Sequence, residues 1–101
     1  MGVEKVLTAC ALIYKKIANT DCCLMTRRSF KSEFLPGMYE LPGGHIESNE
    51  SEIDGLVREI KEELNLDIEV GNIFDSFTYF HKGKLVVENI CLATSISLLS
   101  E

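Results

Sequence analysis

The chain has 101 residues, of which 46% are hydrophobic and 26% charged, and this composition is typical of one small globular domain spanning residues 1–101. No apolar run approaches the roughly 20 residues of a membrane-spanning helix, and no signal peptide is evident at the N-terminus. The net charge of −6 disfavours a nucleic-acid partner, so we expect a soluble cytoplasmic protein with neither a nucleic-acid nor a membrane partner.

Hydrophobic periodicity and turn residues predict the elements in chain order. Two strands, Val6–Tyr14 and Cys22–Thr26, are expected to form a hairpin, and a loop follows from residue 27 to 37. A short strand at Met38–Leu41 leads into Pro42-Gly43-Gly44, which predicts a bare stretch of backbone before a helix. After the helix, two further strands are predicted, namely Ile68–Phe80, interrupted near Gly71, and Lys84–Ser97.

The predicted helix runs from Ser48 or Asn49 to about Leu64. One apolar stripe recurs at helical spacing and consists of Ile53, Leu56, Val57, Ile60 and Leu64. Asn49 and Glu52 have the spacing of a capping box, and Asn65 is suited to a left-handed helix end.

The four cysteines are Cys10, Cys22, Cys23 and Cys91, and no pair has the C-x-x-C spacing of a zinc or redox site. We expect Cys10, Cys23 and Cys91 to lie on strand faces as buried reduced thiols. Free thiols fit a reducing compartment.

Acidic residues are concentrated around the predicted helix. Residues 47–69 carry a net charge of −7, whereas the remainder of the chain carries +1. Glu59 and Glu63 stand four residues apart and share a helix face, with Glu62 one step around it. Such a cluster is either a solvated helix face or a site for a hard cation such as Mg²⁺, because Mg²⁺ prefers carboxylate oxygens. Taken alone, the helix leaves both interpretations open.

The segment from Gly44 to Leu66 resembles the Nudix box, G-x5-E-x7-R-E-U-x-E-E-x-G-U, in which U is a bulky aliphatic residue. The departure is Asn65, which stands where the box has glycine. Since Asn tolerates positive φ, we expect little harm to the helix end. Eight of the nine specified positions match, and they are Gly44, Glu50, Arg58, Glu59, Ile60, Glu62, Glu63 and Leu66.

This resemblance implies an α/β fold, the Nudix-type α/β/α sandwich around a mixed sheet, with a C-terminal part that is short or missing. It also implies hydrolysis of a pyrophosphate bond in a nucleoside diphosphate linked to another group, with Mg²⁺ as cofactor and Mn²⁺ as a substitute. Glu62 and Glu63 are the implied catalytic residues, either of which can be the general base. The implied metal ligands are Gly44, Glu59, Glu62 and Glu63, and the implied supporting pair is Glu50 and Arg58.

Further substrate contacts are predicted in the loop before the box. Arg27 and Arg28 are suited to substrate phosphates, and Phe30 to stacking on a base, although structural roles in the loop serve equally well. Tyr79 and Glu88 are expected on strands that face the cleft, and Glu88 is notable because its strand is largely apolar.

The substrate class is left open among a nucleoside triphosphate, slightly preferred, a nucleotide sugar and ADP-ribose. The alternative to an enzyme is a Nudix-like nucleotide- and metal-binding module, or a truncated fragment, with little turnover. A homodimer is a further expectation, resting on the apolar Leu98 and Leu99 near the end of the chain.

Overall fold

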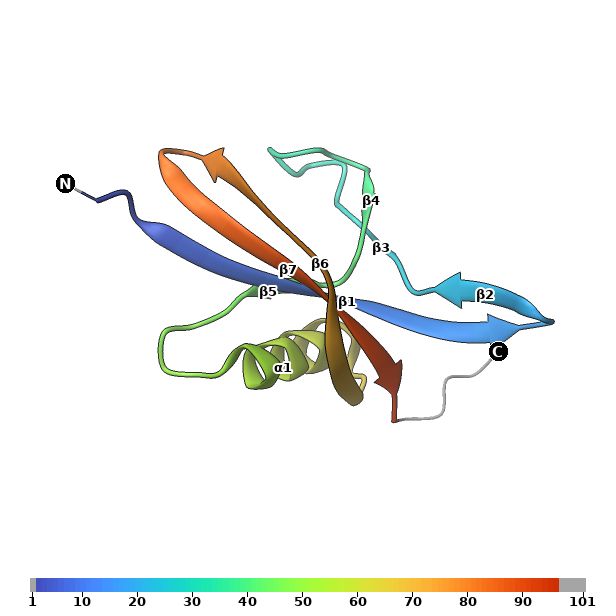
Figure 1. Cartoon of the computed structure of the whole chain (residues 1–101). Helices are drawn as coiled ribbons and strands as arrows, with labels where there is room; N and C mark the ends of the chain where they lie inside the picture. The colour runs from blue at the N-terminus through green and yellow to red at the C-terminus, as the bar shows by residue number, and fades with distance from the viewer. Residues whose placement is uncertain (1, 97–101) are drawn as a thin grey trace.

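The computed structural model describes residues 2–96 (Figure 1). A mixed sheet is built around β1 (Lys5–Ile17), which pairs in parallel with β7 (Lys84–Ser95) along one edge. Along its other edge β1 pairs antiparallel with β5 (Gly43–His45) and β2 (Thr20–Cys23). β6 (Ile68–His81) pairs antiparallel with β7 on the outer side of the sheet. The predicted α/β class with a mixed sheet is therefore confirmed.

A two-stranded ribbon stands beside this sheet. It consists of β3 (Thr26–Arg27) and β4 (Tyr39–Glu40), and the chain between them loops over one face of the molecule (Figure 1). The predicted strand Cys22–Thr26 is wrong as one element, because pairing with β1 ends with a hydrogen bond from Leu24 to the Ile13 carbonyl and pairing with β4 begins at Thr26. The bare backbone predicted at Gly43-Gly44 is itself a strand, since β5 pairs with residues 8–10 of β1.

α1 (Glu52–Leu64) covers one face of the sheet (Figure 1). Alternate residues of β1 face this helix, and two of them are alanines, which allow it to approach closely. The buried core comprises Ala9, Ala11, Ile13, Leu56, Ile60, Ile68, Cys91 and Ala93. Within residues 2–96 this helix forms the single helical layer, and its 13 residues are too few to cross a membrane.

Capping hydrogen bonds determine the residues at which α1 begins and ends. The predicted cap at Asn49 is wrong, because Ser51 accepts a hydrogen bond from the Asp54 N–H at 3.1 Å and the helix begins at Glu52. The predicted end at Asn65 is confirmed, with φ 54° and ψ 36°. The apolar stripe is narrower than expected, since Ile53 is 54% exposed.

All four cysteines are free thiols. Cys10 and Cys91 are buried as predicted, whereas Cys23 is exposed because it lies near the end of the outer strand β2. Leu98 and Leu99, on which the expected homodimer rests, lie outside the described residues.

Candidate active site

One end of the glutamate cluster is an ion-pair network centred on Arg58. Arg58 donates two hydrogen bonds to Glu50, from Nε at 3.0 Å and from Nη2 at 2.7 Å. It also donates to Glu59 and Glu62, at 3.2 and 2.9 Å. We call the Glu50–Arg58 pair the brace. It joins the loop before α1, which carries Glu50, to the helix, and Arg58 also connects the helix to β5 by donating to the backbone carbonyl of His45.

The brace fixes the ionisation of Glu50. Hydrogen bonding from Arg58, and then from the backbone N–H of Glu47, lowers the pKa of Glu50 to about 2. Hydrogen bonding to Glu50 in turn raises the pKa of Arg58. Gly55 makes room for this carboxylate, because a Cβ there would stand 2.8 Å from Oε1 of Glu50. The predicted supporting pair is thus brought together in the structure.

At the other end, three carboxyl groups gather with less compensation. We call Glu40, Glu59 and Glu63 the acidic edge; Glu40 comes from β4 and the other two from α1. Burial, the charge of Glu59 and hydrogen bonding with Glu59 raise the pKa of Glu63 to about 7, with smaller contributions from Glu40 and Glu62. A raised carboxyl pKa means that a proton or a cation is favoured here at neutral pH.

In β5, the backbone of Gly44 lies against the acidic edge. A Cβ on Gly44 would stand 2.6 Å from the carboxylate of Glu59, so only glycine lets that carboxylate lie against the strand. Next to it, a side chain on Gly43 would collide with the backbone of Ala9. Gly43 therefore allows β5 to lie close to β1, and Gly44 allows the Glu59 carboxylate to lie close to β5.

The donor set of the acidic edge suits Mg²⁺. It offers hard carboxylate oxygens from two elements next to Gly44, which has no side chain, and burial and the neighbouring carboxylates raise the pKa of Glu63. Within residues 2–96 no three acidic, histidine or cysteine side chains already stand in a metal-binding arrangement. Arg58 holds Glu59 and Glu62 instead, and the side chain of Glu62 is 58% exposed.

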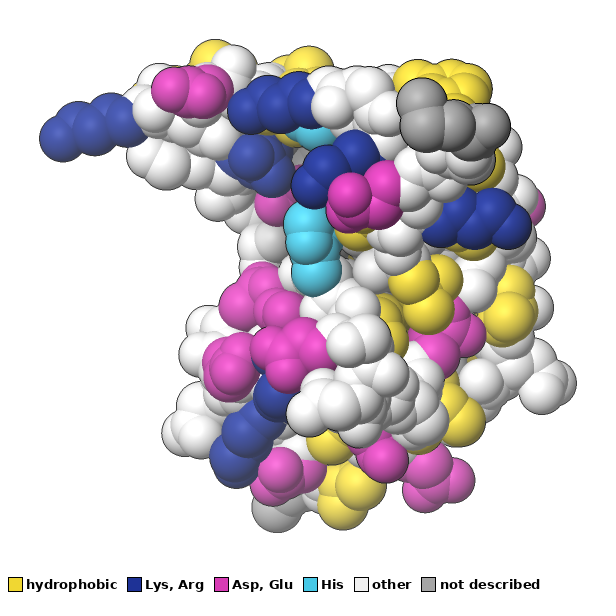
Figure 2. Space-filling view, turned by 90° about the vertical axis from the view of Figure 1, so that its left-hand side faces the viewer, with side chains coloured by type: hydrophobic (Ala, Val, Ile, Leu, Met, Phe, Trp, Pro, Cys, Tyr) yellow, Lys and Arg dark blue, Asp and Glu magenta, His cyan; other side chains and the backbone are white. Residues whose placement is uncertain are grey.

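A pocket opens on the face of the sheet opposite α1, with a volume of about 760 Å³. Its floor is formed by β1, β6 and β7, and its wall by β5 and the segment 28–41. Glu40 and Gly44 line it too, so it is continuous with the acidic edge. Figure 2 shows the molecule hollowed on one side, with acidic side chains below the hollow and basic ones above it.

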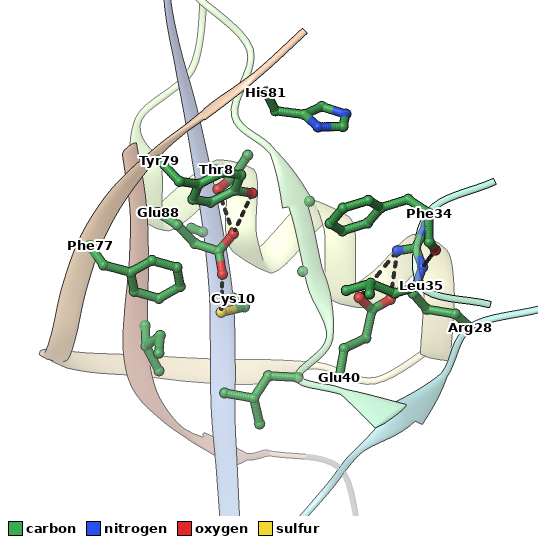
Figure 3. Close-up of a pocket in the computed structure, with 15 residues that line it drawn as sticks. Thr8, Cys10, Arg28, Phe34, Leu35, Glu40, Phe77, Tyr79, His81 and Glu88 are labelled. Atoms are coloured by element: carbon green, nitrogen blue, oxygen red, sulfur yellow. Dashed lines mark hydrogen bonds and ion pairs between the residues drawn. The ribbon is translucent and has the colours of Figure 1, made fainter. Parts of the chain in front are cut away.

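Of the substrate-binding residues predicted in the loop before the box, one lines the pocket and two do not. Arg28 lines the pocket, where it donates to Glu40 at 3.2 Å and to the carbonyl of Phe34 at 2.7 Å (Figure 3). Arg27 stacks between the rings of Phe30 and Tyr39, at 4.6 and 5.1 Å. Neither Arg27 nor Phe30 is among the residues lining the pocket.

Sequence reasoning missed Glu40 as a member of the site. It lies four residues before Gly44 and outside the matched box, and only the β3–β4 ribbon brings it towards Glu63. A carboxylate directly before Leu41-Pro42-Gly43 was the available signal. Tyr79 and Glu88 do face the cleft as expected, and both line the pocket.

Comparison with known proteins agrees with this geometry. A family model described as the NUDIX domain matches residues 5–91. An 8-oxo-dGTP diphosphatase of Proteus vulgaris is 28% identical over 94 residues, covering 93% of this chain and 80% of that protein. A CTP pyrophosphohydrolase of Escherichia coli is 33% identical over 63 residues, covering 62% of this chain and 46% of that protein.

Among solved structures, the solution structure of the E. coli ORF135 protein superposes with a TM-score of 0.73 at 26% identity. It matches 89% of this chain, which in turn spans 61% of the length of that protein. The sheet and α1 therefore form a fold that is found in known proteins.

Proposed function

This chain belongs to the Nudix hydrolase family, and we propose that it hydrolyses a pyrophosphate bond of a nucleotide with Mg²⁺ as cofactor and Mn²⁺ as a substitute. The observation that carries the proposal is the acidic edge. One of its carboxylates, that of Glu59, lies against Gly44, which has no side chain, at the rim of a pocket large enough for a small ligand, and Glu63 lies beside Glu59.

The proposed cation ligands are Glu59, Glu62, Glu63 and the carbonyl of Gly44. When bound there, a divalent cation neutralises phosphate oxygens and lowers the pKa of a water molecule. The proposal is supported by the lie of Glu59 against Gly44, and cation binding would draw the Glu59 carboxylate away from its ion pair with Arg58. The proposed role of the brace is to hold α1 and its preceding loop in register, so that these carboxylates converge.

Either Glu62 or Glu63 is proposed to accept a proton from the attacking water. The two differ in surroundings, since Glu62 is paired with Arg58 whereas Glu63 lies against Glu59. This difference favours Glu63 as the proton acceptor, because its lone pairs are not committed to a guanidinium.

A nucleoside triphosphate is the proposed substrate class, ahead of a nucleotide sugar or ADP-ribose. The relatives named as a diphosphatase of 8-oxo-dGTP and a pyrophosphohydrolase of CTP support this order. The proposed setting is the cytoplasm, in keeping with four free thiols.

The test is a chromatographic turnover assay with Mg²⁺ against triphosphates, nucleotide sugars, ADP-ribose and dinucleoside polyphosphates. Glu63→Gln and Glu69→Gln are assayed beside the parent; Glu69 is an exposed acid on β6, away from the pocket lining. We expect cleavage by the parent and by Glu69→Gln, with a loss of at least about a hundredfold in Glu63→Gln.

Two results would contradict the proposal. Cleavage that is equal in all three proteins would remove Glu63 from the chemistry. Absence of cleavage across the whole panel, by folded protein, would favour the nucleotide- and metal-binding module instead.

A further inference from the structure

The floor of the pocket carries a carboxylate that the proposed hydrolysis does not use. Glu88 lies on β7, directly between Thr8 of β1 and Phe77 of β6 in the strand registers. Paired residues of neighbouring strands point to the same side of a sheet, so this row of three faces the pocket, away from α1. All three line it.

Neutral groups surround this carboxylate (Figure 3). Its Oε1 accepts hydrogen bonds from the Thr8 hydroxyl at 3.2 Å and from the Tyr79 hydroxyl at 3.3 Å. Its Oε2 accepts from the Cys10 thiol at 3.7 Å. Burial, and then the charge of Glu88, raises the pKa of Cys10 to about 12 and that of Tyr79 as well, so both remain donors.

The acceptor capacity of Glu88 is therefore not exhausted. A carboxylate offers about four lone-pair positions, whereas its neighbours occupy three, one of them through a weakly donating thiol. No ion pair among residues 2–96 reaches Glu88. The pocket's nearby cation, Arg28, donates to Glu40. A ligand with an N–H donor would satisfy Oε2, but a ligand carbonyl would be repelled.

The walls of the pocket favour a flat ligand. Phe77 and Tyr79 stack at 6.0 Å between ring centroids with 26° between planes. Phe34 and Leu35 lie across the hollow from them (Figure 3). Aromatic faces of this kind bind planar rings. At the other end the pocket meets Gly44 and Glu40, which is where the proposed function places the phosphates.

We propose that Glu88 is the specificity-determining residue of this pocket and selects nucleotides whose base carries an exocyclic amino group over those with a carbonyl at the same ring position. This inference rests on the proposed function. It narrows the substrate class to amino-bearing bases, recognised by the acceptor position that remains on Oε2 of Glu88.

The experiment compares nucleotide pairs that differ mainly in that one group, CTP with UTP and ATP with ITP. Values of kcat/KM are measured for the parent, Glu88→Gln, Glu88→Asp and the control Glu69→Gln. Binding of the monophosphates CMP and UMP is measured by calorimetry without metal. Since the side-chain amide of Gln has both a donor and an acceptor, it can hydrogen-bond with either an amino group or a carbonyl of the base.

We expect the parent to prefer the amino member of at least one pair by about tenfold or more, mainly through KM, because a wrong group leaves a buried polar atom unpaired. Glu88→Gln should bring the ratio close to one, whereas Glu88→Asp and Glu69→Gln should keep the preference. CMP should likewise bind more tightly than UMP to the parent.

The inference fails if the parent cleaves both members of each pair equally, or if Glu88→Gln leaves the preference intact; the proposed function then stands. If no nucleotide is cleaved, the proposed function fails. The calorimetric titration with CMP and UMP still tests the base preference, because it does not depend on turnover. Equal binding of CMP and UMP, or binding of neither, would overturn it.

Discussion

Glu50 and Glu63 carry the same carboxyl group at two ends of one cluster, yet their surroundings move its pKa in opposite directions. In the brace, Arg58 lowers the pKa of Glu50 to about 2. In the acidic edge, burial and neighbouring carboxylates raise that of Glu63 to about 7. A compensated carboxylate stabilises the fold, whereas an uncompensated one is available to bind a cation or to move a proton.

The comparison separates two kinds of residue within the matched box. Glu50 and Arg58 connect the loop before α1 to the helix, and they already have their partners. Glu59 shares Arg58 and lies against Gly44, whereas Glu63 lies beside Glu59 with Glu40 nearby, and no ion pair among residues 2–96 reaches it. Substitutions in the two groups should therefore differ in their effect on stability as well as on activity.

The largest expected effect follows Glu63→Gln. Turnover should fall by at least about a hundredfold, while the melting temperature of the metal-free protein at pH 8 should stay equal or rise, because one repelling charge is removed. Turnover assays and calorimetric unfolding check this. A lower melting temperature of Glu63→Gln would contradict the distinction between the brace and the acidic edge.

Glu50→Gln should act in the opposite way on stability. Arg58 loses its charged partner, so the melting temperature should fall, and turnover should decrease by about ten- to a hundredfold as the cation ligands lose their support. Thermal unfolding beside Glu69→Gln measures the effect. Unchanged stability would show that the brace does not hold the helix.

Gly44→Ala tests the close approach at the acidic edge. The added Cβ displaces the end of the Glu59 side chain, which can move, so the fold should persist. The Mg²⁺ concentration for half-maximal turnover should rise by about tenfold. Gly71→Ala is the matched control, because a Cβ there meets its nearest atom at an ordinary 3.5 Å. Equal Mg²⁺ dependence in both variants would argue against Gly44 as part of the cation site.

The smallest expected effect is on pH dependence. The pKa of Glu63 rises from 4.5 in the unfolded chain to about 7 in the folded one, so between these values the folded state binds more protons. Its contribution to stability is therefore lost as pH increases from about 4.5 to about 7. Melting temperatures of metal-free parent and Glu63→Gln, measured from pH 4.5 to 8, should diverge in favour of the variant; parallel curves would contradict this.

The helix and the contacts within it could be predicted because they depend on local spacing. The left-handed conformation of Asn65 and the meeting of Arg58 with Glu62 follow from residues close in sequence. The cap could not be fixed in the same way, because Asn49 and Ser51 are both suitable and only the path of the loop decides between them.

The remainder of the site depends on strand pairing, which periodicity does not reveal. Thr8 and Glu88 are 80 residues apart and meet only because β1 and β7 run in parallel with that register. Glu40 reaches Glu63 through the β3–β4 ribbon. The sequence instead predicted Thr26 as the end of a strand in a hairpin and Arg27 as the start of a loop. Contacts within the helix could thus be predicted from spacing, whereas the contacts of Glu88 with Thr8 and of Glu40 with Glu63 could not.

A calorimetric titration of Mg²⁺ into the parent, Glu63→Gln and Glu50→Gln tests most directly whether the uncompensated carboxylates form the cation site. We predict that the parent binds and releases protons on binding at pH 6.5, since Glu63 holds a proton there part of the time. Glu63→Gln should bind more weakly and release fewer protons. Equal affinity and equal proton release in the parent and Glu63→Gln would contradict the assignment.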